Sequence, residues 1–369
     1  MAFLLFLALF SSAQDLSADT LARFSRAVEL QRQGAFRDAE IEYRAVLALN
    51  PGYAEAHANL GAVLMRLNRY QDAIESYQTA LRLAPHLSPI LLNLGIAHYR
   101  KADFAEAVEF FQKFLERSPG QFQAIQLLGL SLLELGRDQE ALQYLEQARA
   151  AAPDDASILY AAGLAHLRLK RPGLAAIIRH LSEVEGGAAA SHLLAGEDLL
   201  SRFEFERAAA ELETAERLNS GLPRLQYSLG LAYFKLGRNR DAMAAFSKEI
   251  DRHPKDFSTL YYLAYLYEAE GNLTLAQKEI DAALSLDPDS AEANALLGKI
   301  RSKAGKTNEA LPALESAVAR DPNDPEKRYL LARAYQQAGR KEEANKQFAE
   351  VQRLKREQLE KDRKAMPKP

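Results

Sequence analysis

A repeat of 34 residues is the feature that most constrains how this chain can fold. The spacing separates Pro51, Pro85, Pro119 and Pro153, and it returns between Pro254, Pro288 and Pro322. A period of this length indicates small helical units, each of which buries one face against its neighbours. We therefore expect the 369 residues to form one array of stacked units rather than two or three globular domains.

Ten units follow from this period, and each reads as a pair of helices. They begin at Thr20, Ala54, Ser88, Phe122, Ala156, Ala189, Pro223, Phe257, Ala291 and Pro325. Apolar residues recur at helical spacing, and the prolines fall where a second helix must stop. The twentieth residue of every unit is alanine, from Ala39 to Ala344, and glycines such as Gly61 and Gly95 lie in the first helices. These small residues predict that the two helices of a unit pack closely.

The units resemble the tetratricopeptide repeat family from residue 20 to about residue 356. The resemblance rests on segments such as NLGAVLMRLNRYQDAIESYQTALRLAP (Asn59 to Pro85) and SLGLAYFKLGRNRDAMAAFSKEIDRHP (Ser228 to Pro254). The chain departs from the family at the fourth position, where the family often has tryptophan. The resemblance implies an all-α solenoid, a right-handed superhelix of antiparallel helix pairs. It also implies that the first helices line a concave, protein-binding surface.

One unit in the middle of the chain is irregular. The fifth unit is one residue short, carries Arg179 where other units carry a bulky apolar residue, and ends in Gly186 and Gly187. Adjacent glycines weaken a helix end and permit bending. We therefore expect five N-terminal repeats at 14–187 and five C-terminal repeats at 188–356. A degenerate unit with intact stacking is the alternative to a hinge.

The composition argues against several classes of function. A net charge of -3 does not provide the broad basic surface that nucleic acid binding needs. The chain has no cysteine, and its seven histidines form no recognisable metal-binding motif. No nucleophile motif and no phosphate-binding glycine loop is present. We therefore expect no enzyme, no catalytic residue, no metal site and no cofactor.

The last residues, 357–369, predict a polar extension of the final helix. Glu357 and Lys361 are spaced to form an ion pair within a helix, as are Glu360 and Lys364. Such an extension would cover the last face of the array, which solenoids need for solubility. A basic tail that binds nucleic acid or anionic lipid is the alternative.

The N-terminus has the layout of a signal peptide. An unbroken apolar run from Phe3 to Phe10 is followed by the small residues Ser11 and Ala13. This layout predicts a leader at residues 1–13, cleaved after Ala13, and a periplasmic or secreted protein. The run is shorter than the about 20 apolar residues that cross a bilayer, so we expect no stable membrane span. An apolar end packed on the first helix is the alternative.

A strip along the first helices is the candidate binding site. Their fifth, ninth and twelfth positions share one face, which is apolar and aromatic from the third to the eighth unit. Other faces already supply the helix contacts, so this strip should be exposed, and exposed apolar strips mark binding sites. Internal packing is the alternative. We predict a protein-binding groove lined by Leu92, Ile96, Tyr99, Leu130, Leu133, Tyr160, Leu164, Tyr227, Leu231, Phe234, Tyr261 and Tyr265.

These observations together predict an exported, non-catalytic scaffold or adaptor. It would bind a peptide segment of a partner protein in its apolar groove and help to assemble a cell-envelope or secretion complex. Two alternatives remain open at this point. One is a structural solenoid that associates with itself, and the other is an accessory subunit of an envelope enzyme complex.

Overall fold

The computed structural model describes residues 16–365, which form twenty helices and no strand. The leader predicted at residues 1–13 lies outside the described residues. The helices run over Ala18–Arg32 (α1), Phe36–Leu49 (α2), Ala54–Arg66 (α3), Tyr70–Leu83 (α4), Ser88–Lys101 (α5), Phe104–Arg117 (α6), Phe122–Glu134 (α7), Asp138–Ala151 (α8), Ala156–Arg168 (α9), Leu174–Glu183 (α10), Ala188–Ser201 (α11), Phe205–Leu218 (α12), Leu225–Lys235 (α13), Asn239–Arg252 (α14), Phe257–Ala269 (α15), Leu273–Leu286 (α16), Ala291–Lys303 (α17), Thr307–Arg320 (α18), Pro325–Gln337 (α19) and Lys341–Ala365 (α20).

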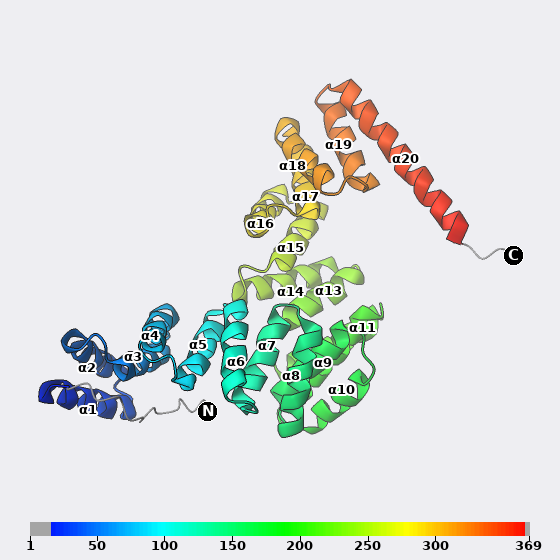
Figure 1. The fold of residues 1–369 in the computed structure, drawn as a ribbon. Coiled ribbons are helices and arrows are strands. Elements are labelled where there is room, and N and C mark those ends of the chain that lie inside the picture. Colours follow the sequence, from blue (N-terminus) through cyan, green and yellow to red (C-terminus); the bar gives the residue numbers. More distant parts are fainter. Residues whose placement is uncertain (1–15, 366–369) are drawn as a thin grey trace. The chain divides into compact units, whose positions relative to one another are not determined.

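The chain falls into two compact units, Met1–Leu194 and Ala195–Pro369, and the boundary lies within α11. In the first unit, α1 to α10 pair in chain order, and each second helix also packs against the first helix of the next pair (Figure 1). In the second unit, the helices from α13 to α20 pair in the same way. The prediction of an all-α solenoid built from helix pairs is therefore confirmed.

In six of the ten pairs, a bulky residue of the second helix lies over a glycine of the first. A Cβ atom on Gly61 would lie 2.7 Å from the ring of Tyr77, and one on Gly95 would lie 2.6 Å from the ring of Phe111. Both aromatic residues are fully buried. The glycines therefore leave space for these rings, which is a more specific role than the close helix approach that the sequence predicted.

The irregular fifth unit uses a different register. Nine of the ten repeated alanines are buried, but Ala175 is exposed, because α10 begins late and turns Leu174, Ile177 and Leu181 inward instead. Arg179 is also exposed, and Leu194 fills the space over the glycine of this pair. The predicted close packing at the alanine is wrong for this unit, because a shift of register rotates a helix by about 100° for each residue. The predicted hinge stays a prediction.

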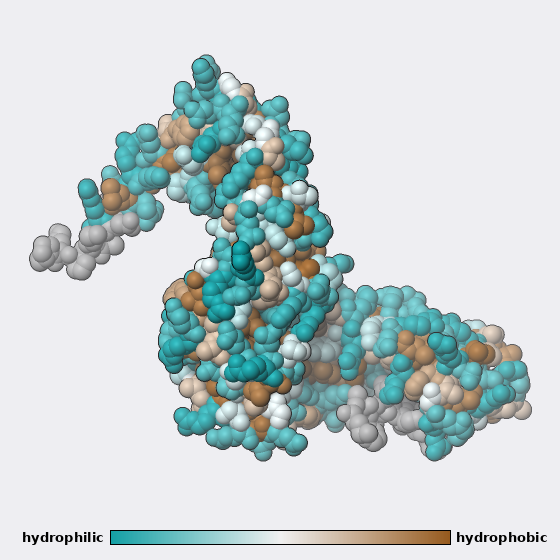
Figure 2. Space-filling model, turned by 180° about the vertical axis from the view of Figure 1, so that it is seen from behind, coloured by the Kyte–Doolittle hydropathy of each residue, from teal (hydrophilic) through white to brown (hydrophobic). Residues whose placement is uncertain are grey.

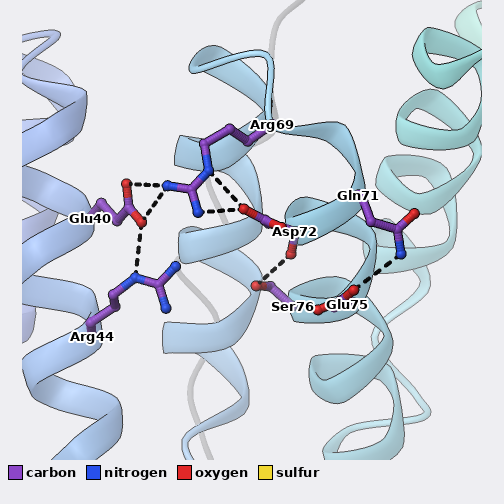
Figure 3. A network of polar contacts seen from close by, with 7 residues as sticks. All are labelled: Glu40, Arg44, Arg69, Gln71, Asp72, Glu75 and Ser76. Carbon is purple, nitrogen blue, oxygen red and sulfur yellow. Dashed lines mark hydrogen bonds and ion pairs between the residues drawn. The ribbon is translucent and has the colours of Figure 1, made fainter.

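Ion pairs on the surface join the second helices of successive pairs. In Figure 3, Arg69, which directly precedes α4, lies between Glu40 of α2 and Asp72 of α4. The guanidinium nitrogen Nη1 of Arg69 lies 2.8 and 3.0 Å from the two carboxylate oxygens of Glu40, which also accepts a hydrogen bond from Arg44. Exposed ion pairs of this kind contribute about 0 to 1 kcal/mol each to the free energy of unfolding. Most of the stability therefore comes from the apolar core.

The turn inside every pair contains a residue with left-handed backbone geometry shortly after the first helix ends, and the turn of the fifth pair contains a second one, Gly173. Glycine occupies this place in six pairs, as in Gly136 with a φ of 70°. The other four pairs have Asn68, Ala102, Lys170 and Phe203, with φ values between 51° and 65°. Side chains disfavour this geometry because Cβ approaches the following carbonyl oxygen. Phe203 is the bulkiest of the four and is 78% exposed.

Replacing Phe203 by glycine is expected to raise the free energy of unfolding by about 0.5 to 1 kcal/mol. Glycine removes the steric cost of left-handed geometry, which is about 1 to 2 kcal/mol. It also loses more backbone entropy on folding, and this loss offsets part of the gain. Chemical denaturation followed by circular dichroism measures the change. Asn68→Gly is the matched control and should change little, since asparagine tolerates this geometry. A Phe203→Gly variant less stable than the wild type would contradict the prediction.

Candidate protein-binding groove

The first helices of the last three pairs lie side by side in the second unit. Helix α17 contacts both α15 and α19, and a pocket of about 260 Å³ opens between these helices. A second pocket of about 230 Å³ lies between α17 and α19, and the two pockets share Lys299 and Leu330. We call the two pockets together the C-terminal groove. They are lined mainly by Tyr261, Tyr265, Glu292, Leu296, Lys299, Lys303, Glu326, Lys327, Tyr329, Leu330 and Arg333.

In the first compact unit, the side chains of the predicted strip are buried or half-buried. Leu92, Leu133 and Leu164 are buried in one apolar cluster, so these three side chains belong to the core and offer no surface to a ligand. The prediction that the whole strip is exposed is wrong at these positions, because the adjacent first helix covers them. The other four predicted residues of this unit are half-buried: Ile96, Tyr99, Leu130 and Tyr160.

In the second compact unit, the predicted strip is more accessible and consists mainly of aromatic residues. Tyr227, Leu231, Phe234 and Tyr261 are half-buried, and Tyr265 is 37% exposed. The rings of Phe234 and Tyr265 meet edge to face, with centroids 5.6 Å apart and planes at 90°. Such pairs stabilise the fold by about 0.5 to 1.5 kcal/mol beyond the contribution of the area that they bury, and they hold the rings in defined positions. The aromatic wall of the groove is therefore preorganised.

A buried carboxylate positions two lysines at one side of the groove. The side chain of Glu268 on α15 is 1% exposed, and its oxygens lie 2.9 Å from Lys299 Nζ and 2.5 Å from Lys303 Nζ. Burial alone would raise the pKa of this carboxyl, but the two ammonium groups outweigh it and hold the pKa below its ordinary value. Lys299 Nζ also lies 5.7 Å from the ring centroid of Tyr265, within cation–π range.

A buried lysine gathers carboxylates at the other side of the groove. The Lys327 side chain is 8% exposed, and its Nζ lies 2.7 Å from Asp324, 3.0 Å from Asp321 and 3.3 Å from Glu292. Burial would raise the pKa of the Asp324 carboxyl, but hydrogen bonds from Lys327 and from two backbone N–H groups hold it below its ordinary value. A carboxyl with a lowered pKa stabilises the fold above its unfolded pKa, and this stability is lost as the pH falls through the folded pKa.

Replacing Lys327 by methionine is expected to lower the free energy of unfolding at neutral pH by about 1 to 2 kcal/mol. The carboxylates lose the cation that they share, and their partial exposure limits the cost. The deficit should shrink as the pH falls toward about 4, because protonation removes the repulsion between them. Denaturant titrations at both pH values measure it. The exposed Lys306→Met control should change little, and an equal deficit at both pH values would refute this account.

The predicted stripe does not include every residue that lines the groove: Glu292, Leu296, Lys303, Glu326, Lys327 and Leu330 all lie outside it. Lys327 and Leu330 occupy the third and sixth positions of α19, outside the stripe of fifth, ninth and twelfth positions. Lys299 and Arg333 do occupy ninth positions, but they belong to the ninth and tenth units, beyond the part of the strip that is apolar and aromatic. The recurrence of a cation at the ninth position of α17 and α19 was the signal that could have pointed to this part of the groove.

Apolar residues outside the groove are exposed mainly as single side chains. Figure 2 shows hydrophilic residues over most of the face that it displays, with hydrophobic residues in small separate areas. The most exposed large apolar side chains include Phe203, Ile41 and Leu218, which lie on different helices or turns. Single exposed apolar residues are normal for soluble proteins and mark no site by themselves.

Within residues 16–365, no group of three or more histidine, aspartate or glutamate side chains is placed to hold a metal ion. Among the helices of that same range, none has the length and apolar character needed to cross a bilayer.

Comparisons with known proteins identify the repeat. Sequence models described as tetratricopeptide repeat match residues 52–120, 99–167, 193–257, 227–291 and 302–360, which together cover more than half of the chain. A search of curated proteins found no match.

Solved structures of the protein MamA are similar to part of this chain. The MamA RS-1 ArsTM double mutant is 24% identical, with a TM-score of 0.44, over 47% of this chain and 97% of its own. MamA 41-end from Desulfovibrio magneticus RS-1 is also 24% identical, with a TM-score of 0.45, over 47% of this chain and 98% of its own.

Proposed function

This chain belongs to the tetratricopeptide repeat family, whose members are protein-interaction scaffolds, and from that premise we propose that its C-terminal groove binds a peptide segment of a partner protein. The observation that carries the proposal is an open pocket that is lined by Tyr261 and Tyr265 of α15 and by Leu330 of α19. Tyrosine combines a large apolar surface with few rotatable bonds, so it binds at a low cost in entropy.

The proposed role of the bound segment is to attach its protein to an assembly in the cell envelope or in a secretion system. This step rests on the apolar leader at residues 1–13. In such an assembly the repeats act as a non-catalytic scaffold, and the groove supplies specificity through its aromatic and charged side chains.

The binding proposal is tested by affinity capture with the full chain. Immobilised wild-type protein and a Tyr261→Ala/Tyr265→Ala variant are incubated with extract from the native host, and bound proteins are quantified by mass spectrometry. A partner retained by the wild type and lost on the variant supports the proposal. Equal retention on both proteins would refute it. If no partner is retained and sedimentation equilibrium shows a mass that rises with concentration, self-association replaces peptide binding as the function.

We propose a periplasmic or secreted location for the same protein. The motivating feature is the position of Ser11 and Ala13 directly after the apolar run. The exported fraction is expected to begin at Gln14, because cleavage follows Ala13. Intact-mass measurement of that fraction decides the matter, and a retained Met1 would exclude cleavage.

A further inference from the structure

Charges of opposite sign flank the C-terminal groove. On α17, Glu292 and Lys299 are seven residues apart, and on α19 the same spacing separates Glu326 from Arg333. Seven residues of helix span about 10 Å along the axis. All four residues line the groove. Both helices therefore present a carboxylate near their first turn and a cation about 10 Å further along.

The first side of the groove carries an excess of negative charge. Four carboxylates lie there, and Lys327 is the cation that pairs with three of them. The fourth, Glu326, is exposed, and within the described residues no cation forms an ion pair with its carboxylate. This side can therefore accept a positively charged group from a ligand without losing an internal ion pair.

The second side carries an excess of positive charge. Lys299 and Lys303 share the one carboxylate of Glu268. Arg333 is exposed, and in the part of the chain that the structure describes it has no carboxylate partner. A guanidinium in this position can bind a carboxylate of a ligand through two parallel hydrogen bonds.

The surface between the two charged sides is apolar and aromatic. Tyr265 and Leu330 line it, and Lys299 lies against the face of the tyrosine ring. An apolar side chain of a ligand would meet this surface at the same time as its charged neighbours meet the two sides. A ligand with charges of one sign would instead place like charges together on one side, which costs affinity.

We infer that the C-terminal groove is specific for a bipolar peptide segment. The segment carries a basic residue for Glu292 and Glu326, an acidic residue for Lys299 and Arg333, and an apolar residue between them. The charges lie about 10 Å apart, which corresponds to about seven residues in a helical ligand or three in an extended one. The inference rests on the proposed function and names the chemistry of its partner.

The test selects ligands without assuming their sequence. A phage-displayed library of random peptides is selected on the immobilised full chain and on two variants, Glu326→Lys and Arg333→Glu. Both changed residues are exposed and have no ion-pair partner within residues 16–365, so both variants should fold, which circular dichroism checks. Wild-type protein should enrich peptides with one basic and one acidic flank. Glu326→Lys should enrich acidic peptides, and Arg333→Glu should enrich basic ones.

Affinities of one selected peptide then test the assignment of each side. Each single reversal should weaken a bipolar peptide by about tenfold. Reversing the acidic residue of the peptide should restore its binding to Arg333→Glu and should not restore its binding to Glu326→Lys, as expected when one charge faces one partner. Selection of peptides with a single sign of charge, or equal binding to wild type and both variants, would overturn the inference.

Failure of the proposed function has a different outcome. Peptides of one charge sign that are lost on Tyr265→Ala would leave the groove as a binding site and overturn only its bipolar specificity. Peptides that bind Tyr265→Ala as well as wild type, or the absence of any enriched peptide, would argue against both proposals.

Discussion

Replacing Phe111 by alanine is expected to lower the free energy of unfolding by about 3 to 5 kcal/mol. The side chain is fully buried, and its ring occupies the space that Gly95 leaves open on α5. Alanine would leave a cavity at the centre of the third helix pair. The surrounding helices can close it only in part, because their own side chains are packed on both sides.

The measurement must allow for partial unfolding, since arrays of repeats can lose individual units. Hydrogen exchange of α5 and α6 should therefore accompany urea denaturation of the full chain. Phe122→Ala is the matched control, because this phenylalanine begins α7, the first helix of the next pair, and is 37% exposed. Similar losses for the two variants would mean that the assigned role of the buried ring is incorrect.

Truncating Tyr265 to alanine is expected to weaken partner binding by about 2 kcal/mol, or roughly thirtyfold. Its ring faces the groove and contacts Phe234 and Lys299, but much of it remains accessible. Folding stability should change by less than about 1 kcal/mol, because little buried surface is lost. Titration calorimetry with the captured partner, together with chemical denaturation of each variant, separates the two effects.

Two further variants make this comparison decisive. Leu286→Ala removes an apolar residue with similar exposure, 39%, from the end of a second helix, so it should leave binding unchanged. Phe234→Ala removes a ring packed between Tyr262 and Tyr265, so it should lower both binding and stability. A large loss of stability in Tyr265→Ala would assign this residue to the core and remove it from the groove.

Much of the architecture could be predicted because repeat periodicity is a local property. The expected starts at Ala54, Ser88 and Phe122 are the first residues of α3, α5 and α7. Helix boundaries depend on turn residues, prolines and the spacing of apolar side chains, all of which lie within about 34 residues of sequence. The all-α class and the pairing of neighbours followed from the same local pattern.

In the fifth pair, the repeated pattern does not predict which residues of the second helix are buried. Ala175 stands at the same place as nine buried alanines, yet α10 turns it outward. A late helix start, with Gly173 in left-handed geometry before Leu174, changes which face points inward. Periodicity gives the position within a unit, but the phase of a helix is decided by the residues that it buries most favourably.

The candidate site depended on tertiary structure more than the fold did. The residues that share the stripe on the first helices follow from the sequence alone, because 3.6 residues per turn place them on one face. The sequence does not show that adjacent helices bury Leu92 and Leu164 while leaving Tyr265 open, since exposure depends on neighbours distant in sequence. Only packing brought Glu292 of α17 to Lys327 of α19, because these two residues lie 35 positions apart, whereas Asp324 lies within one helical turn of Lys327.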